Sequence, residues 1–326
     1  MISRVNILVT GATGFIGRHL VGALSKTYSV RCLARKTSDI TPLKDLNVDI
    51  AYGDLLVKES LGPALDGIDL VYHLAGEVYS RKKSDYCKGN VLTTQNLLEA
   101  CKEKGMKRVI FLSSIAVYKP AAKEILLTEE SDCEPLTIYG KTKLEVEALI
   151  KGCNIPWVIV RGPIVYGPYQ PPVLNQFFLN AFNKRKVYIV GKKDTPRSYC
   201  FTGNLVDGLM LIANRPDTNG KTYILSDNLP YTFEDLVRAT SMAIKQEVRV
   251  VHLPSIMGNI SWQINNLIGK VFSLYFVKLY ALKTMQLHWE CDISKAKKEI
   301  GYSPRFTLEM GIESTMNWIR NSFTRC

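Results

Sequence analysis

Short, nearly continuous runs of apolar residues alternate with stretches of helical hydrophobic spacing along the first half of the chain. The runs lie at residues 5–9, 30–34, 48–51, 70–74, 109–112 and 157–160, and helical spacing is clearest at 91–104 and 139–151. Apolar strands separated by helices are typical of a parallel sheet that is covered on both faces. The pattern therefore predicts an α/β fold with a doubly wound parallel sheet over residues 1–166.

The second half of the chain is less regular, and it is rich in Pro, Asn and aromatic residues just after Gly167 and Pro168. A strand is expected near 221–226, followed by an amphipathic helix from Thr232 that Glu234 and Asp235 favour near its N-terminus. We expect residues 167–326 to form a smaller, mostly helical substrate-binding lobe, with about 198–228 returning to the main sheet.

Residues 256–287 are rich in aliphatic and aromatic side chains. The longest uncharged run, 250–269, contains Pro254 and several amides, so a transmembrane span is not expected. Two interpretations remain. The segment forms a pair of helices that line a substrate pocket, which is the favoured interpretation, or an interfacial amphipathic helix with Lys270, Lys278 and Lys283 in peripheral contact with a membrane.

The composition is that of an ordinary globular protein. Of 326 residues, 46% are hydrophobic and 22% charged, which excludes collagen-like, coiled-coil and wholly disordered chains. The eight cysteines show neither CxxC nor metal-ligand spacing. They are typical of reduced thiols, so we expect a cytoplasmic protein with no metal site and no signal peptide.

The positive charge is concentrated in the second half. Residues 1–150 hold 20 Lys/Arg and 18 Asp/Glu, whereas residues 151–326 hold 22 and 12. This asymmetry favours an anionic small molecule, a membrane surface or nucleic acid as a partner. A basic surface without a dedicated partner is the alternative. Nucleic acid is not expected, because no basic motif interleaved with aromatic residues is present.

A glycine-rich loop follows the first strand. Gly11, Gly14 and Gly17 stand at three-residue spacing between that strand and a helical pattern at 18–25, with Thr13, Phe15 and Ile16 between them. Such glycines permit a tight turn, close approach of backbone N–H groups to a pyrophosphate and close packing of helix on strand. The loop predicts a dinucleotide site.

The end of the second strand indicates which dinucleotide is bound. NAD favours a carboxylate there, whereas NADP carries a phosphate that a carboxylate would repel. Arg35 and Lys36 stand at this point, and no acid occurs until Asp39. NADP(H) is therefore favoured over NAD(H), with Arg35 on the 2′-phosphate; the alternative is a solvated basic turn.

Tyr139 and Lys143 lie one helical turn apart, on the same face of a predicted helix. A phenol is a poor acid–base catalyst at neutral pH unless its anion is stabilised, as by a nearby cation and an oxidised nicotinamide. Ser114, just past the fifth strand, is placed to donate a hydrogen bond to a substrate oxygen. The three residues predict a catalytic group for hydride-transfer chemistry.

These features together resemble the extended short-chain dehydrogenase/reductases, a family of nucleotide-sugar epimerases, dehydratases and related ketone reductases with a Rossmann domain. The resemblance covers nearly the whole chain. The matching motifs are TGATGFIG at 10–17, GDL at 53–55, HLAG at 73–76, SSIAVY at 113–118, Tyr139-x-x-x-Lys143, RGPIVYGP at 161–168 and NLVDG at 204–208.

The resemblance implies roles for further residues. Asp54 and Leu55 would contact adenine, Leu74, Ala75 and Gly76 would line the diphosphate side, and Pro163 and Ile164 would lie along the nicotinamide. Tyr139 would be the acid/base, Lys143 would bind the nicotinamide ribose and Ser114 would polarise the substrate. Asn90 would be a structural or relay residue, with a helix N-cap as the equal alternative. A homodimer through the helices near 90–104 and 139–151 is also implied.

The positions after Ser114 narrow the reaction. Dehydratases of this family carry an acid there, because loss of water needs a general acid. Ile115 and Ala116 cannot transfer protons, so epimerisation or net redox chemistry remains.

For the substrate, Arg197, with Lys192 and Lys193 nearby, resembles the arginine that clamps a nucleotide diphosphate. The alternative for Arg197 is a structural ion pair. A nucleotide-linked sugar is the favoured substrate. An apolar ketone or alcohol, as in hydroxysteroid dehydrogenases and flavonoid reductases, is a second possibility, and a non-enzymatic NADP(H)-binding protein is a third.

Overall fold

The structure is a computed structural model, and it describes residues 5–121, 124–191 and 195–323. The N-terminal part is built on a seven-stranded sheet in the order β10-β6-β5-β4-β1-β2-β3, in which every strand pair is parallel. The strands are β1 (Asn6–Thr10), β2 (Ser29–Ala34), β3 (Asp49–Tyr52), β4 (Leu70–His73), β5 (Arg108–Ser114), β6 (Trp157–Gly162) and β10 (Lys221–Ile224). The predicted doubly wound parallel sheet is confirmed, and each of the six apolar runs overlaps one of its strands.

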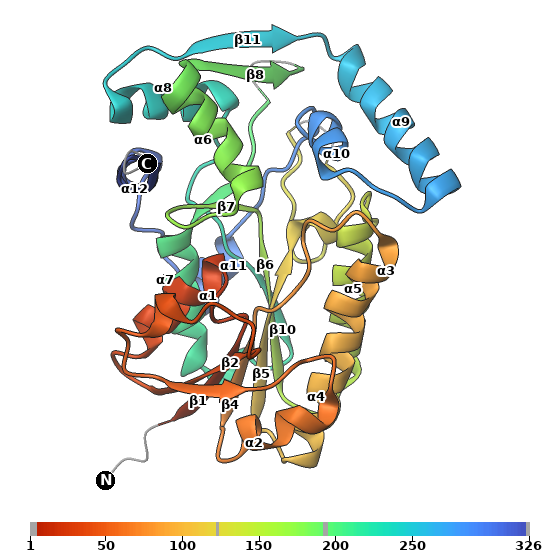
Figure 1. The fold of residues 1–326 in the computed structure, drawn as a ribbon, viewed down its shortest axis with the longest axis vertical. Coiled ribbons are helices and arrows are strands. Elements are labelled where there is room, and N and C mark those ends of the chain that lie inside the picture. Colours follow the sequence, from red (N-terminus) through yellow and green to blue (C-terminus); the bar gives the residue numbers. More distant parts are fainter. Residues whose placement is uncertain (1–4, 122–123, 192–194, 324–326) are drawn as a thin grey trace.

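Helices cover both faces of this sheet (Figure 1). On one face α1 (Phe15–Leu24) packs against α7 (Thr202–Ala213), with α11 (Ser294–Ile300) beside β10. On the other lie α2 (Gly62–Leu65), α4 (Thr93–Glu103) and α5 (Ile138–Gly152). Two separate apolar cores result, because each central strand directs alternate side chains to opposite faces: Ile7 and Val9 belong to one core and Leu8 to the other.

The C-terminal region contains two small parallel sheets that the sequence did not reveal. One pairs β7 (Ile164–Tyr166) with β9 (Tyr199–Phe201), and the other pairs β8 (Lys186–Val190) with β11 (Arg249–Leu253). They are accompanied by α6 (Pro172–Lys184), α8 (Phe233–Ile244) and α12 (Leu308–Phe323) around a third core. The helix predicted from Thr232 is α8, and Thr232 and Asp235 form a capping box at its N-terminus.

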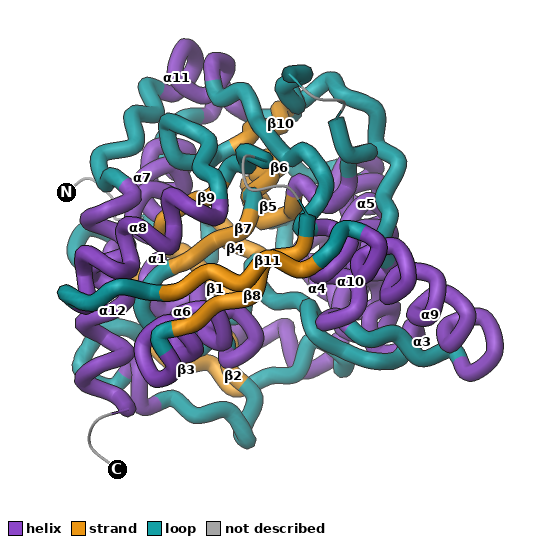
Figure 2. The backbone as a smooth tube through the Cα atoms, turned by 90° about the horizontal axis from the view of Figure 1, so that it is seen from above, coloured by secondary structure: helices purple, strands orange, loops and turns teal. Residues whose placement is uncertain are grey.

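Residues 256–284 form a helical hairpin that contributes no residue to any of the three cores. Its arms are α9 (Ile256–Phe272) and α10 (Val277–Thr284), and α9 reaches the outer edge of the molecule in both views (Figures 1 and 2). Among the described residues, no helix is long and apolar enough to cross a membrane. The short helix α3 (Lys83–Tyr86) and its continuation, a wide helical turn at 87–92, lie between this hairpin and α4.

Candidate active site

The glycine loop leaves no room for side chains between β1 and α1. Gly11 has a φ of +70°, and a Cβ there would lie 2.7 Å from the Ala75 nitrogen. A Cβ on Gly17 would overlap the Gly11 carbonyl, so this glycine allows α1 to pack tightly on the loop. The helix begins at Phe15, with its N-terminal N–H groups at the loop. This is the cradle that a pyrophosphate requires, and the residues fit the predicted dinucleotide.

A cavity of about 620 Å³ extends from this loop across the carboxyl ends of the strands to α10. Most of the predicted site residues line it. They are Gly11, Gly14, Phe15, Ile16, Gly17, Leu74, Ala75, Gly76, Ser114, Tyr139, Pro163, Ile164 and Arg197. The cavity joins the candidate dinucleotide loop to the candidate catalytic residues, although the two lie far apart in the sequence.

Five predicted cofactor residues lie outside the lining of this cavity: Lys143, described below, and the four that follow. Thr13 accepts a hydrogen bond through its carbonyl from Arg18 at 3.1 Å. Arg35 is exposed directly after β2, where its backbone N–H donates to Ser38. The Asp54 carboxylate accepts from the Leu56 N–H at 2.9 Å, and the Leu55 carbonyl accepts from Asn96. Their proposed contacts with adenine and ribose depend on a ligand reaching past the cavity.

Tyr139 stands in the first turn of α5, facing Ser114 at the end of β5. Thr137 caps this helix by accepting from the Gly140 N–H at 3.0 Å. Burial raises the pKa of Tyr139 to about 12, while a side-chain hydrogen bond with Ser114 acts to lower it. The protein's own groups therefore keep this phenol protonated at neutral pH, and a further positive charge is needed to bring its pKa into the working range.

Lys143 lies beneath Tyr139, on the same face of α5. Its Nζ donates to the Leu112 carbonyl at 2.9 Å and lies 6.0 Å from the centre of the Tyr139 ring. Burial lowers the pKa of Lys143 to about 8, and the charge of Glu147 opposes that effect. The amine does not line the cavity. A Cβ on Gly76, which does, would lie 3.4 Å from Lys143 Nζ.

A buried ion pair holds α5 against the sheet. Arg161 on β6 makes a two-pronged contact with Glu147, with Nε–Oε1 at 3.0 Å and Nη2–Oε2 at 2.6 Å. Ser113 also donates to Glu147, at 2.6 Å. Because Glu147 is one turn beyond Lys143 on α5, this contact fixes the position of Tyr139 and Lys143 along the helix axis relative to Ser114.

Asn90 ties the loop after β4 to α5. It is buried in the wide turn before α4, where its Oδ1 accepts from the Glu77 N–H at 2.8 Å. Its Nδ2 donates to the Glu77 carbonyl and to Thr142, each at 3.0 Å. The helix N-cap alternative is therefore wrong, because all three bonds of this side chain go to distant segments.

Arg197 is a buried cation at the far end of the cavity, with only 2% of its surface exposed. Its backbone is held between Tyr231 and the strand-like segment at Trp289, and one Nη donates to the Thr284 carbonyl of α10. The guanidinium lies 5.3 Å from the centre of the Phe233 ring. Its Nε has no hydrogen-bond partner, and no carboxylate of the described residues pairs with it. The structural ion pair considered for Arg197 is not found within the described ranges, which exclude 192–194 and so also Lys192 and Lys193.

Several lining residues had no sequence signal of their own. Glu77 and Tyr79 follow the glycine at the end of β4, and the Glu77 carboxylate accepts from the Tyr79 N–H at 2.9 Å. The α10 residues Tyr280 and Thr284 also line the cavity. The favoured interpretation of 256–287 as two pocket-lining helices is thus correct for α10. It is wrong for α9, which contributes no residue to the lining.

Comparisons with known proteins agree with this geometry. The model of the NAD dependent epimerase/dehydratase family matches residues 7–226. The chain is 27% identical to the uncharacterized UDP-glucose epimerase YtcB of Bacillus subtilis (strain 168), over 98% of this chain and 99% of that protein. It is 25% identical to a sterol-4-alpha-carboxylate 3-dehydrogenase, decarboxylating, of Homo sapiens, over 96% and 88%.

Solved structures share the whole fold. The UDP-glucuronic acid 4-epimerase from Bacillus cereus, in complex with UDP-glucuronic acid and NAD, superimposes with a TM-score of 0.81 at 26% identity. The match covers 98% of this chain and all of that one.

Proposed function

Because the chain belongs to the NAD dependent epimerase/dehydratase family, we propose that it epimerises or oxidises a nucleotide-linked sugar by hydride transfer through a keto intermediate. The membership confirms the resemblance to extended short-chain dehydrogenase/reductases and identifies an NAD-dependent enzyme. The non-enzymatic alternative is set aside for that reason.

The observation that carries the proposal is the buried guanidinium of Arg197. Among the described residues, which leave out Asp194, no carboxylate pairs with this guanidinium, and its Nε has no hydrogen-bond partner. A buried cation and a buried donor in such surroundings are both costly. An anion entering the cavity offsets both. Arginine presents forked donors that match phosphate oxygens, so a substrate diphosphate suits this position. The solved epimerase of Bacillus cereus, which holds UDP-glucuronic acid and NAD, supports the same assignment.

We assign the proton transfer to Tyr139. When bound, the dinucleotide supplies the acceptor and donor of the hydride, together with the positive charge that stabilises a phenolate. The Tyr139 oxygen then takes the proton of the reacting sugar hydroxyl. After the keto sugar has rotated in the cavity to present the opposite face of its carbonyl, Tyr139 returns the proton to the carbonyl oxygen. Ser114 would donate a hydrogen bond to the reacting oxygen of the sugar, and Lys143 would bind the nicotinamide ribose.

The remaining predicted residues are assigned to the dinucleotide. The glycine loop and Leu74, Ala75 and Gly76 would hold the pyrophosphate side, Pro163 and Ile164 would lie along the nicotinamide, and Asp54 and Leu55 would contact the adenine. The preference for NADP(H) rests on Arg35, which follows β2 where no acid is present before Asp39. The relative of known structure holds NAD.

Dehydration is disfavoured at this site. Ile115 and Ala116, which directly follow Ser114, both line the cavity and cannot transfer a proton. The Glu77 carboxylate is engaged by the Tyr79 N–H. Epimerisation and net oxidation or reduction therefore remain as the reactions of this site.

Product analysis by NMR tests the proposal. A panel of nucleotide sugars is incubated with the enzyme and catalytic NAD+ or NADP+, without cofactor recycling. Appearance of a new sugar isomer without net cofactor reduction is the expected result. If every sugar of a panel that includes UDP-glucose and UDP-glucuronic acid is returned unchanged with both cofactors, the proposal fails for those substrates.

A second candidate is reduction or oxidation of an apolar ketone or alcohol. Two observations favour it: the cavity near Tyr139 is walled by apolar residues such as Ile115, Leu136 and Val277, and a sterol dehydrogenase is among the relatives. Net, stoichiometric oxidation of NAD(P)H with a hydrophobic ketone, in an enzyme inert to nucleotide sugars, would establish this alternative.

A further inference from the structure

The outer face of α9 is a continuous stripe of large aliphatic side chains. Ile256, Ile260, Ile264, Leu267 and Val271 are each between 46% and 63% exposed. At about 100° per residue these five positions fall on a single side of the helix. A stripe of this kind normally faces a protein core, yet here it faces away from the molecule, whose body lies on the other side of the hairpin (Figure 2).

The inward face of α9 is composed of small and polar residues. Gly258, Ser261, Asn265 and Gly269 are buried against the rest of the hairpin. The Asn265 Oδ1 accepts from the Phe276 N–H at 2.8 Å, and Ser261 donates to the Leu279 carbonyl at 3.1 Å. A Cβ on Gly269 would overlap the Tyr275 ring. The orientation of α9 is therefore fixed by specific contacts, and rotation cannot bury the aliphatic stripe within the chain.

The charge around this stripe has one sign. Residues 248–289 contain no Asp or Glu, but they include Arg249, Lys270, Lys278 and Lys283. Lys283 donates to the exposed Asn259 at 2.7 Å, which brings its ammonium group from α10 to the polar side of α9. Lysines flanking an apolar helix face are typical of helices that lie in the headgroup region of a bilayer.

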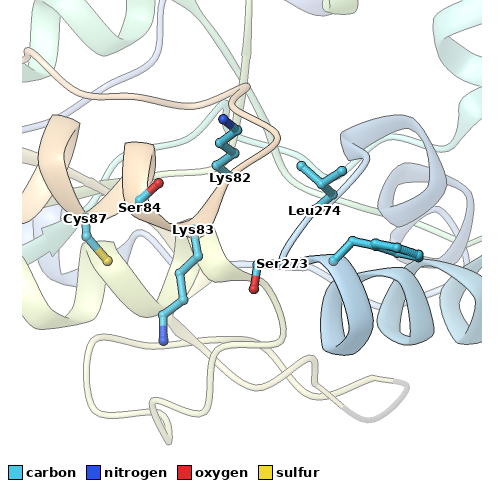
Figure 3. Close-up of a pocket in the computed structure, with 7 residues that line it drawn as sticks. Lys82, Lys83, Ser84, Cys87, Ser273 and Leu274 are labelled. Carbon is cyan, nitrogen blue, oxygen red and sulfur yellow. The ribbon is translucent and has the colours of Figure 1, made fainter.

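A second basic and apolar feature adjoins the end of α9. A hollow of about 420 Å³ there is lined by Lys82, Lys83, Ser84, Cys87, Phe272, Ser273 and Leu274. Figure 3 shows Lys83 and Ser84 on one side and Ser273 and Leu274 on the other. The Tyr275 N–H donates to the Arg81 carbonyl at 2.7 Å, so the basic segment 81–83 is tied to the hairpin. Cationic and apolar groups in one hollow suit a phosphate headgroup and the start of its acyl chains.

We propose that the outer face of α9, together with this basic hollow, docks on the surface of an anionic phospholipid bilayer. The helix lies in the interface, since no described helix can span a membrane. A second copy of this chain is a poorer occupant. In a twofold interface the same patch meets itself, so lysines would face lysines with no carboxylate of 248–289 to pair with them.

Docking has a consequence for the enzyme. The hairpin's other arm, α10, lines the catalytic cavity through Val277, Tyr280, Ala281 and Thr284. A bilayer against α9 would therefore hold the cavity close to the membrane surface. The proposal does not depend on which substrate is turned over, so it and the proposed function can fail separately.

Vesicle flotation of the full-length protein tests the docking. Wild type is mixed with vesicles of phosphatidylcholine alone or of phosphatidylcholine and phosphatidylglycerol in equal parts. We expect strong binding to the anionic vesicles, weakening as salt is raised. The variant Ile264→Glu/Leu267→Glu should lose roughly tenfold or more of this binding. Lys270→Glu/Lys278→Glu should lose about fivefold or more for each lysine.

The matched control is Leu229→Glu/Met242→Glu, which places two acids at equally exposed apolar positions outside the hairpin. It should float with the vesicles nearly as wild type does, apart from its altered net charge. Thermal unfolding and dinucleotide binding establish that each variant is folded. Three results would overturn the proposal: no binding to anionic vesicles, equal binding to neutral ones, or a dimer in light scattering that the α9 variant abolishes while vesicle binding is absent.

Discussion

Lys143 Nζ lies 6.0 Å from the centre of the Tyr139 ring, while its hydrogen bond goes to the Leu112 carbonyl at 2.9 Å. The two residues share one face of α5, but the hydrogen bond of the ammonium goes to the main chain of β5. The pKa of the phenol is raised and that of the amine is lowered by the same buried environment. A charge brought by a bound ligand can therefore change the protonation of either group.

Replacing Tyr139 by Phe should remove the proton transfer. We expect turnover to fall by roughly a thousandfold, with dinucleotide affinity nearly unchanged, because the lost hydroxyl acts on the sugar. Tyr79→Phe is the matched control, since Tyr79 lines the same cavity; it should retain most activity. Steady-state kinetics and dinucleotide titration measure both effects. Near-normal turnover in Tyr139→Phe would remove Tyr139 from the acid/base role.

The lowered pKa of Lys143 predicts a fall in activity at alkaline pH. The ammonium is charged below a pH of about 8 and loses its charge as the pH rises through that value. With it goes the cation that helps to stabilise the Tyr139 phenolate. The dependence of kcat/KM on pH should therefore show a descending limb near pH 8. A Lys143→Arg variant should move that limb upward, because guanidinium stays charged; a profile without this limb would contradict the prediction.

Loss of Arg197 should weaken substrate binding more than the chemical step. For Arg197→Met we expect KM for the nucleotide sugar to rise by about tenfold to a hundredfold, the range for a lost charge-assisted contact. The affinity for a nucleoside diphosphate should fall by a similar factor, whereas that for the unphosphorylated nucleoside should not. Isothermal titration with both ligands makes this comparison. Equal affinities of wild type and variant for the diphosphate would refute the clamp.

Reversing the charge at Arg35 tests the cofactor preference. Arg35→Asp should weaken NADP(H) by roughly tenfold more than NAD(H), because it sets a carboxylate against the 2′-phosphate. Arg35 is exposed, so folding should be unaffected. Fluorescence titration of both reduced cofactors gives the ratio. An unchanged ratio would leave Arg35 as part of a solvated basic turn.

Asp227 should make stability depend on pH between about 4 and 6. Burial raises its pKa from 3.8 to about 6, although Phe201 N–H, Asn204 and Tyr166 all donate to the carboxylate. The folded state therefore holds the proton over a range in which the unfolded chain releases it. The stabilising contribution is present below pH 3.8 and is lost as pH rises through about 6, a change of about 3 kcal/mol.

Urea unfolding of wild type and Asp227→Asn across this range isolates the effect, because the other carboxylates are common to both proteins. The difference between their free energies of unfolding should shift by that amount in favour of the variant as the pH rises. Parallel curves would show that Asp227 does not titrate in this window.

Much of the site was predictable because its parts are local. Apolar runs of the right length identified the strands of the main sheet, since a strand buried on both faces needs apolar side chains in succession. The glycine loop was recognisable because its turn and close packing exclude side chains at fixed positions. The shared face of Tyr139 and Lys143 followed from helix geometry alone.

Other features depended on partners far away in the chain. Asn90 was consistent with a helix cap by sequence, but its side chain bonds Glu77 and Thr142, which only the folded chain brings together. Strands β7 and β9 have three residues each, too few for a periodic signal, and their pairing exists only in the tertiary structure.

The sequence by itself thus determined the fold class, the glycine loop and the helix that carries Tyr139 and Lys143, because backbone periodicity and glycine sterics act over a few residues. Only the tertiary structure decided that Arg197 lies buried at the cavity and that α9 turns its aliphatic side outward. Burial and partnership are properties of the whole packing, and Gly269 against Tyr275 and Asn265 against Phe276 settle the orientation of α9 through contacts that its own periodicity does not specify.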